Sequence, residues 1–455
     1  MKMTSINPFT EEINAEFENY SGREIETIVT ESRKEFVRWK LTTQGQRVAI
    51  IKNIGRLLIK NKNHFSALIT KEMGKPIKES AAEIEKCALV CDYYGDNAEK
   101  FLQPEIIPTE AKKSYASFEP LGVILAIMPW NFPFWQVFRF AIPALAVGNT
   151  VLLKHAPSVP ISALAIEKLM REAGLPEHAF RALLIDEAAA MKLIEDNKVD
   201  GVSLTGSNRA GSQIGALAGK KIIKAVLELG GSDPFLVLED ADISRAAKFA
   251  VKSRFVNAGQ SCIAAKRFIV MEKAAVGFLE KFRENLLKLN TGDPMDPATD
   301  IGPLAQERFV ELLERQLNDS LALGGKAFWG PEIKSAKGFF FRPVIVAGAD
   351  SRMRIMNEEV FGPIAPVIIV KTEVEAIQIA NATEYGLGAS VWSENIEKAE
   401  RIAAKIDAGF ISINDMVKSD PRLPFGGVKN SGVGRELSHY GLKEFVNVKT
   451  IVVNN

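Results

Sequence analysis

Residues 122–154 read GVILAIMPWNFPFWQVFRFAIPALAVGNTVLLK, and this stretch indicates the class of fold. It predicts a strand at Gly122–Ile127, a helix at Phe134–Leu145 and a second strand at Thr150–Lys154. A strand, a helix and a further strand in succession form a βαβ unit, which is typical of a parallel, doubly wound sheet. Ligands of such sheets bind beyond the carboxyl ends of the strands, so the residues that follow each strand are the first candidates for a site.

The alternation of strands and helices continues along the chain and predicts two α/β units. The first unit has further strands at Ala182–Ile185, Gly201–Leu204 and Ile222–Leu227, and helices at Ser162–Glu172, Glu187–Glu195 and Arg209–Ala218. The second unit is predicted from strands at Pro234–Leu238, Lys266–Met271, Pro366–Val370, Ala389–Trp392 and Phe410–Ile413, and from helices at Ile243–Phe255 and Phe278–Leu289. Residues 26–103 have a charged helical pattern, and a final apolar strand, Thr450–Val453, would be an exposed edge without a partner.

The composition excludes several classes of protein. The chain has 455 residues, with 57 Lys and Arg against 56 Asp and Glu, and a net charge of +1 argues against a nucleic-acid binder. Three cysteines argue against a disulfide framework and favour a reducing, cytoplasmic setting. Residues 1–20 lack the apolar run of a signal peptide, and the longest apolar runs are far shorter than the ~20 residues of a membrane span. No CxxC, HExxH or His-x-His spacing indicates a metal site.

Neither of two common phosphate-binding motifs is present. A G-x-G-x-x-G run between a strand and a helix is missing, and so is a Walker loop. The segment LTGSNRAG at 204–211 does follow a strand and open a helix, where Ser207 and the free N–H groups of the helix N-terminus can bind an anion. An ordinary strand–turn–helix junction with Ser207 as its N-cap explains the same residues, so this segment alone leaves both interpretations open.

Three residues have side chains and local contexts suited to covalent chemistry. Cys262 ends NAGQSC at 257–262, a turn whose free N–H groups can lower a thiol pKa; the alternative is an inert buried cysteine. Glu228 ends an apolar strand, where partial burial would bring its pKa into the range of a general base; the alternative is a surface glutamate. Asn131 lies between two prolines, where a rigid amide can bind an oxyanion; the alternative is an asparagine that only forms a turn. No local context marks a histidine as the base of a Cys–His pair.

Seven segments, taken in order, resemble motifs of the aldehyde dehydrogenase superfamily. They are PWNFP at 129–133, LLK at 152–154, TGS at 205–207, LELGG at 227–231, GQSC at 259–262, EEVFGP at 358–363 and PFGG at 424–427. The resemblance covers the chain from about residue 40 onward. It implies an α/β fold with a Rossmann-like cofactor domain (1–102 and 121–230), an α/β catalytic domain (231–440) and a small β oligomerisation element (103–120 and 441–455). In that element the last strand would pair across a dimer, and the resemblance leaves dimer and tetramer open.

The resemblance also implies a mechanism. Cys262 would attack the aldehyde carbonyl, and the Asn131 amide and the Cys262 backbone N–H would hold the resulting oxyanion. Hydride transfer to a nicotinamide would leave a thioester, and Glu228 would activate the water that hydrolyses it to a carboxylic acid.

The resemblance implies a cofactor site built from many parts of the chain. Its predicted residues are Met128, Pro129, Trp130, Lys154, Pro157, Gly206, Ser207, Gly211, Leu229, Glu359 and Phe361. Pro157 stands where NAD-specific relatives often carry a glutamate, so no carboxylate repels a 2′-phosphate, and Lys154 and His155 could attract one. No well-placed serine donor replaces the glutamate either. We therefore expect the enzyme to use NAD and to tolerate NADP.

Arg139 is the residue that suggests a substrate. It lies on the same helix as the apolar Trp135, and an arginine beside the walls formed by Phe132 and Trp135 could bind a substrate carboxylate. A structural salt bridge explains Arg139 equally well from the sequence alone. Succinate-semialdehyde dehydrogenases carry an arginine at this position, and the segment around Ser419, Arg422 and Phe425 is similar to a short bacterial branch of those enzymes. The resemblance thus implies oxidation of succinate semialdehyde to succinate, with Ser419, Arg422 and Phe425 as further substrate residues.

Other functions stay open at this stage. Val256 stands where some of these enzymes carry a second arginine, so another small aldehyde is an alternative substrate. Transfer of the acyl group to CoA is a second alternative, against which Glu228 argues because that reaction needs no hydrolytic base. A catalytically idle binding or structural protein on the same fold is disfavoured by the set Cys262, Glu228 and Asn131.

Overall fold

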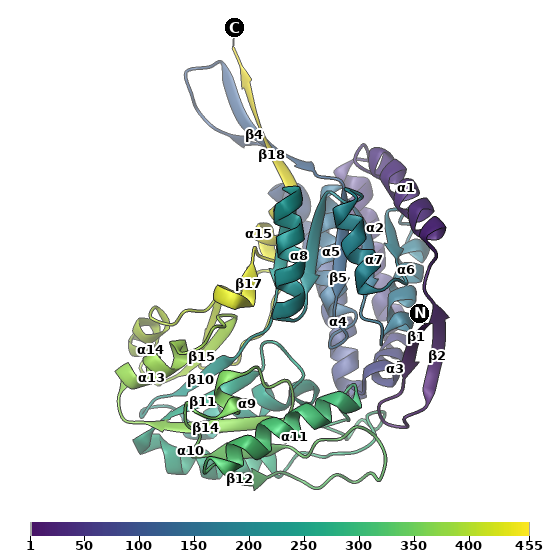
Figure 1. Cartoon of the computed structure of the whole chain (residues 1–455). Coiled ribbons are helices and arrows are strands. Elements are labelled where there is room, and N and C mark those ends of the chain that lie inside the picture. Colours follow the sequence, from purple (N-terminus) through teal and green to yellow (C-terminus); the bar gives the residue numbers. More distant parts are fainter. Residues whose placement is uncertain (1, 455) are drawn as a thin grey trace.

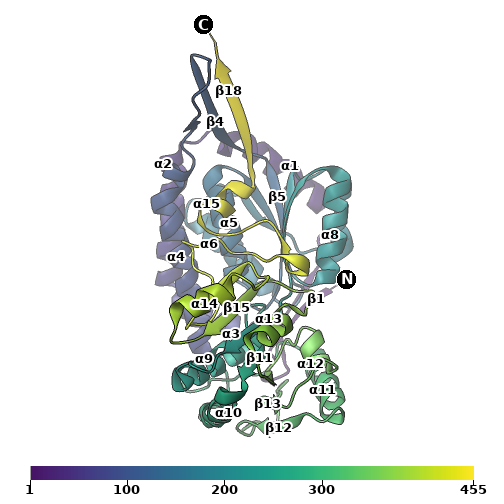
Figure 2. The same cartoon turned by 90° about the vertical axis from the view of Figure 1, so that its left-hand side faces the viewer.

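The protein is described by a computed structural model that covers residues 2–454 and confirms the α/β class (Figure 1). Its body contains two large sheets with helices against them, and a narrow β arm projects from one end (Figures 1 and 2). None of the helices within residues 2–454 combines the length and the apolar character needed to cross a membrane.

The first sheet has six strands in the order β17-β9-β8-β5-β6-β7. These strands are β5 (Val123–Met128), β6 (Thr150–His155), β7 (Phe180–Ala182), β8 (Gly201–Thr205), β9 (Lys224–Glu228) and β17 (Gly432–Val433). All neighbouring pairs are parallel except β17 with β9. The chain builds outward from β5 through β6 and β7 and then returns to add β8 and β9 on the other side of β5, so a topological switch point lies between β5 and β8.

Helix α5 (Trp135–Val147) connects β5 to β6 and is buried over its whole length, because its side chains are apolar on nearly every face. The other helices of this sheet are α6 (Pro160–Glu172), α7 (Glu187–Glu195) and α8 (Asn208–Lys221). On its far side α5 packs against α4, the last of four N-terminal helices. These are α1 (Gly22–Trp39), α2 (Gln44–Lys60), α3 (Lys62–Met73) and α4 (Ile77–Phe101), and an antiparallel hairpin of β1 (Lys2–Ile6) and β2 (Ile13–Glu18) precedes them.

The second sheet has seven strands in the order β12-β13-β14-β11-β10-β15-β16. They are β10 (Asp233–Val237), β11 (Ala265–Met271), β12 (Lys326–Trp329), β13 (Val344–Ala347), β14 (Ile364–Val370), β15 (Gly388–Trp392) and β16 (Phe410–Ile413), of which only β12 is antiparallel to its neighbour. The helices are α9 (Ile243–Phe255), α10 (Glu272–Leu286), α11 (Glu307–Ala322), α12 (Arg354–Asn357), α13 (Glu373–Asn381) and α14 (Ile396–Ala403). Buried aromatic rings, Phe235, Phe268, Phe278 and Phe282 among them, form the core between β10, β11 and α10.

The projecting arm consists of β4 (Lys113–Pro120) and β18 (Val446–Val453), which pair antiparallel along eight residues each, with the short β3 (Glu105–Ile106) beside β4. Helix α15 (Ser438–Glu444) leads into β18 and contacts α4 and α5. In the order β18-β4-β3, the terminal strand β18 is an edge strand with exposed apolar side chains.

The predicted elements lie close to the observed ones, with some exceptions. Helices Glu187–Glu195 and Ile243–Phe255 have the bounds predicted. The strand predicted at Ala182–Ile185 is displaced, because β7 pairs with β6 through Phe180–Ala182. The sequence patterns did not predict the hairpin β1–β2 or the strands β12, β13 and β17. The catalytic domain was predicted to end at residue 440, but β17 already pairs with the first sheet before that point. The division into domains stays a proposal.

Candidate active site

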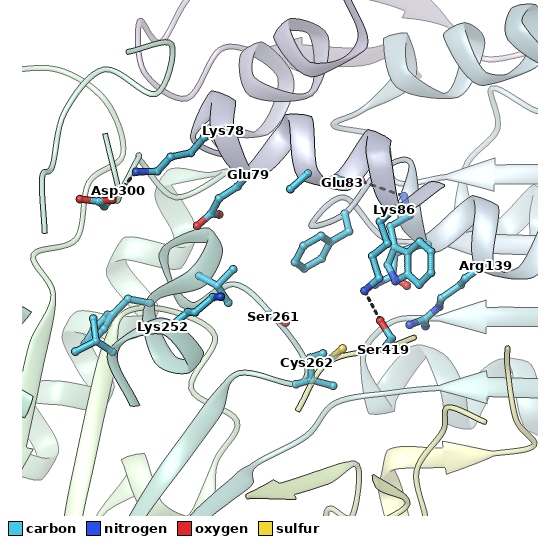
Figure 3. A pocket seen from close by; sticks show the side chains of 18 of the residues that line it. Lys78, Glu79, Glu83, Lys86, Arg139, Lys252, Ser261, Cys262, Asp300 and Ser419 are labelled. Carbon is cyan, nitrogen blue, oxygen red and sulfur yellow. Dashed lines mark hydrogen bonds and ion pairs between the residues drawn. The ribbon is translucent and has the colours of Figure 1, made fainter. Parts of the chain in front are cut away.

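A cavity of about 510 Å³ is lined by side chains of α4, α5 and α9 and by the loop before β11 (Figure 3). Six of the predicted site residues line this one cavity: Cys262, Arg139, Phe132, Trp135, Ser419 and Phe425. The structure thus brings together a nucleophile, aromatic walls and cationic side chains that lie far apart in the sequence.

Cys262 follows a strained turn. Asn257, Ala258 and Gly259 all have φ between +52° and +78°, a left-handed conformation that costs a non-glycine residue about 1–2 kcal/mol. Glu79 of α4 stabilises the turn, because its carboxyl accepts a hydrogen bond from the Asn257 backbone N–H at 2.8 Å. At Gly259 a Cβ would lie 2.5 Å from the carbonyl of Gly362, so only glycine fits there.

Arg254, at the end of α9, joins this turn to the predicted EEVFGP motif. Its fully buried guanidinium donates to the carbonyl oxygens of Ala265 and Val360, each at 3.0 Å, and also to that of Gly362. Burial lowers its pKa to about 9, so it is still charged at neutral pH. Sequence reasoning missed Arg254, because the end of α9 also carries Lys252 and Ser253 and nothing in that pattern distinguishes a buried arginine.

The Cys262 thiol is half-buried and not yet activated. Burial raises its pKa to about 11, although the positive charges of Arg139 and Lys266 act in the opposite direction. Lys266 lies under the loop and donates to the carbonyl oxygens of Ser261 and Cys262, at 2.9 and 2.6 Å. The lysine therefore fixes the backbone that carries the thiol.

Asn131 lies against the Cys262 loop, as an oxyanion donor must. Its Nδ2 donates to the carbonyl of Gln260 at 3.1 Å, and its own carbonyl accepts from Asn257 Nδ2 at 2.9 Å. An amide nitrogen carries two hydrogens, so the second N–H stays available for a developing oxyanion. The alternative of a residue that only forms a turn is therefore disfavoured, because the side chain is 4% exposed and points to the catalytic loop.

Glu228 ends β9 and is buried, which excludes a surface glutamate. Glu228 is not among the residues that line the cavity with Cys262. Its Oε1 has no hydrogen-bond partner within residues 2–454. This oxygen lies close to Gly426, where an added Cβ would come within 2.7 Å of it. Burial, and then the nearby Glu436 carboxyl, raise the pKa of Glu228 well above its usual range, against the effect of Arg139. In this arrangement burial and the Glu436 carboxyl favour the protonated form of Glu228.

Arg139 forms the structural ion pair that the sequence analysis left as an alternative. Its Nε contacts the Glu436 carboxylate, both side chains are almost fully buried, and its Nη2 donates to Thr205 Oγ1 at 3.2 Å. The guanidinium also lies over the Phe425 ring, 4.9 Å from its centroid. Arg139 thus faces the cavity with its charge already balanced.

The other two polar candidates for the substrate differ in position. Ser419 lies in the cavity wall, where its hydroxyl accepts a hydrogen bond from Lys86 Nζ at 2.6 Å (Figure 3). The structure contradicts the prediction for Arg422, because this side chain is 76% exposed, pairs with Asp420 and does not line the cavity. Sequence reasoning missed Lys86, because nothing in the pattern of α4 shows which helical turn faces the nucleophile.

Most of the predicted cofactor residues lie at or after the carboxyl ends of strands of the first sheet, and Glu359 and Phe361 come from the segment before β14. Ser207 caps α8, and Gly211 lies where a Cβ would come 2.5 Å from the methyl groups of Leu229, so glycine permits the close packing of α8. Lys154, near the end of β6, is buried, and its ammonium makes no ion pair or hydrogen bond with the side chains or backbone of residues 2–454, although the charges of Glu187 and Asp186 act on it. An ammonium without a direct acceptor fits the hydroxyl and phosphate groups of a dinucleotide.

On the nicotinamide side, Glu359 accepts a hydrogen bond from the Gly231 N–H at 3.0 Å and lies 3.5 Å from Lys266 Nζ. The rings of Trp130 and Phe361 pack edge to face, 5.8 Å apart. His155 does not have the role expected of it: its Nε2 hydrogen-bonds to the Pro133 carbonyl at 2.8 Å, and burial lowers its pKa to about 4. A neutral imidazole held in this way adds no charge that could attract a 2′-phosphate.

Comparison with known proteins agrees with this geometry. The model of the aldehyde dehydrogenase family matches residues 1–451, and the chain belongs to that family. Among its relatives, the probable succinate-semialdehyde dehydrogenase [NADP(+)] of Synechocystis sp. is 44% identical over 451 residues, which are 99% of each chain. The succinate-semialdehyde dehydrogenase [NADP(+)] of Mycolicibacterium paratuberculosis is 42% identical over all of this chain and 97% of its own.

A solved structure of a dehydrogenase is also similar to this chain. The succinic semialdehyde dehydrogenase from Streptococcus pyogenes, crystallised in complex with NADP+ as the cofactor, is 37% identical and superposes with a TM-score of 0.97 over the whole of both chains. The family resemblance of the seven sequence motifs is thereby confirmed.

Proposed function

We propose that this enzyme oxidises succinate semialdehyde to succinate and transfers the hydride to NADP. The observation that carries the proposal is the cavity that unites the Cys262 thiol with the cationic side chains of Lys86 and Arg139. A four-carbon aldehyde with a terminal carboxylate fits this cavity, because its aldehyde carbon can meet the thiol while its carboxylate meets the positive side chains. The names of the relatives support the same substrate.

The reaction begins at Cys262. The thiol gives its proton to solvent and the thiolate adds to the aldehyde carbon, while the second N–H of Asn131 and the Cys262 backbone N–H stabilise the oxyanion. A dinucleotide bound at the predicted cofactor residues would supply the acceptor for the hydride of this carbon, so that Cys262 would then carry a thioester.

Hydrolysis then requires a base and a water molecule. Glu228 must lose its proton and turn from Glu436 toward the thioester, where it accepts a proton from the attacking water. The C–S bond breaks, succinate leaves and the thiolate is regenerated. The carboxyl of Glu228 thus acts on water in its charged form, which burial beside Glu436 disfavours.

The cofactor proposal reverses the order expected from the sequence, which placed NAD before NADP. Two relatives carry NADP(+) in their names, and the S. pyogenes structure holds NADP+. Lys154 would contact the ribose or its phosphate, Ser207 and the N-terminus of α8 would bind the pyrophosphate, and Pro157 leaves no negative charge against a 2′-phosphate. A dimer or tetramer and a cytoplasmic location stay predictions.

Product analysis tests this proposal. Purified enzyme is given succinate semialdehyde and NADP, and the products are followed by NMR and by absorbance at the NADPH wavelength. We expect one succinate for each NADPH, with or without added CoA. Formation of succinyl-CoA, or NADPH formation without succinate, would contradict it.

A further inference from the structure

Lys86 is a half-buried cation in the wall of the cavity that contains Cys262 (Figure 3). It lies on α4, a helix that supplied no predicted site residue. Within residues 2–454 its ammonium forms no ion pair with a carboxylate; it donates to Ser419 Oγ at 2.6 Å and lies over the Trp135 ring, 4.2 Å from the centroid. The charge of Asp420 acts on Lys86 from nearby, but this carboxylate is paired with Arg422, so the direct partners of the ammonium are a serine hydroxyl and an aromatic face.

The nearest carboxyl group on the same helix cannot supply a counter-ion. Glu83 lies one turn before Lys86, but its Oε1 accepts from the backbone N–H groups of Phe134 and Trp135, at 2.9 and 3.0 Å. Its Oε2 pairs with the fully buried Lys75. Both oxygens of Glu83 are therefore engaged in the structure of α4 and α5.

The remaining cations of the cavity differ from Lys86. Lys78 pairs with Asp300 at 2.5 Å, and Arg139 pairs with Glu436. Lys248 and Lys252 also line the cavity, but they are exposed to solvent. Among the cationic residues that line the cavity, Lys86 alone is partly shielded from solvent and forms no ion pair in the described chain.

A partly desolvated ammonium without an ion-pair partner favours an anionic ligand, because the ligand offsets the cost of removing the charge from water. Burial, and then the positive charge of Arg139, lower the pKa of Lys86 to about 8. A carboxylate in contact with both the Lys86 ammonium and the Ser419 hydroxyl would restore the charged form and accept two hydrogen bonds.

We propose that Lys86 Nζ and Ser419 Oγ together bind the terminal carboxylate of the substrate. This assignment rests on the proposed oxidation of succinate semialdehyde and deepens it. It differs from the anchor expected from the sequence, because Arg139 is held by Glu436 and acts on the position of Phe425 in the cavity wall. Lys86 is then the residue that determines specificity for an aldehyde acid over a neutral aldehyde.

The test compares two four-carbon aldehydes, succinate semialdehyde and butanal, which differ in the terminal carboxylate. For each enzyme form the ratio of kcat/KM for succinate semialdehyde to that for butanal is measured. We expect Lys86→Met to lower this ratio at least about tenfold, mainly through a higher KM for succinate semialdehyde, and Lys86→Arg to retain more of it. Lys78→Met is the matched control, since Lys78 lies on the same helix and cavity but is already paired.

The outcomes separate this assignment from the proposed function. A wild-type enzyme that does not prefer succinate semialdehyde would overturn both. A wild-type preference that persists in Lys86→Met, or that falls equally in Lys78→Met, would overturn the Lys86 assignment alone. If Lys86→Met does not fold, Ser419→Ala replaces it: loss of the Lys86 partner should lower the same ratio several-fold, and an unchanged ratio would refute the assignment.

Discussion

At the scale of single residues, the structure describes a Cys262 thiol that is not yet activated. Cys262 is half-buried, and its thiol has a pKa of about 11, so only a small fraction is thiolate at neutral pH. Cys87 and Cys91 are fully buried and also have raised pKa values, which makes them inert. The reactivity of the chain with thiol reagents therefore reports on one residue.

This predicts a steep pH dependence for the alkylation of Cys262. Because the reacting species is the thiolate, the rate with iodoacetamide in cofactor-free enzyme should rise about tenfold per pH unit from pH 7 to pH 9. Mass spectrometry of the modified peptide measures the rate, and Cys262→Ser should show no modification in this range. A rate that reaches a plateau below pH 8 would mean that the thiol is activated before the cofactor binds.

A second prediction concerns Glu228. The substitution Glu228→Gln keeps the size of the side chain and places no charge in a buried site, so the fold and the first half of the reaction should persist. We expect a burst of NADPH close to one equivalent per active site, followed by a steady-state rate lower by about 10²–10⁴-fold. Stopped-flow absorbance measures both phases; disappearance of the burst would instead assign Glu228 to the attack of Cys262.

Some residues of the candidate site could be predicted from the sequence, and others could not. Cys262, Glu228 and Asn131 were predicted because short motifs surround them. The pairing of Arg139 with Glu436 was not, since the two residues are distant in sequence and meet only when the segment after β17 folds back on α5. Lys86 was missed for a related reason: its role depends on which side of α4 faces the loop of Cys262.

At the scale of elements, the turn η1 (Val256–Gly259) decides where the nucleophile lies. It is held by Glu79 from α4 and by Arg254 from α9, so two elements of different cores meet at it. Backbone strain at such a turn persists only where surrounding contacts oppose its relaxation.

The third prediction tests that dependence. Gly259→Ala places a Cβ against the Gly362 carbonyl at a positive φ, and we expect it to lower the free energy of unfolding by about 2 kcal/mol or more and kcat at least tenfold. Urea denaturation and steady-state rates measure the two effects. Gly219→Ala in α8 is the matched control: a Cβ there meets nothing within 4 Å, so stability should stay the same or rise slightly. Equal losses in both variants would contradict the role of the turn.

Among the elements, buried parallel strands were the most predictable, because continuous apolar runs between helical patterns mark them. Strand β17 could not be predicted, since Gly432 and Val433 join the sheet only through their pairing with β9. The hairpin β1–β2 was also missed: its second strand is largely exposed and carries acidic residues, so no apolar run indicates it.

At the scale of the whole molecule, the arm of β4 and β18 stands away from both cores (Figure 2). As an edge strand, β18 leaves one row of backbone groups without a partner in the described chain, and Val448, Val452 and Val453 are exposed on it. Natural proteins usually cover such an edge. We propose that a second copy of the chain covers it.

A truncated protein tests this proposal. Removal of residues 448–455 deletes most of β18 but keeps Phe445, whose carbonyl accepts a hydrogen bond from Asn149 in the first core. We expect light scattering to show a smaller assembly than for the full chain, while circular dichroism shows the same secondary structure. An unchanged molecular mass would place the interface elsewhere.

The near-zero net charge of +1 conceals an uneven distribution that suits the proposed reaction. Positive side chains meet in the cavity of Cys262, although the chain as a whole is balanced. The most direct test of that central claim is the specificity of the wild-type enzyme with saturating NADP. We predict that kcat/KM for succinate semialdehyde exceeds that for butanal by at least about tenfold, the effect of one charge-assisted contact to the carboxylate. Equal values for the two aldehydes, or a higher value for butanal, would contradict the account.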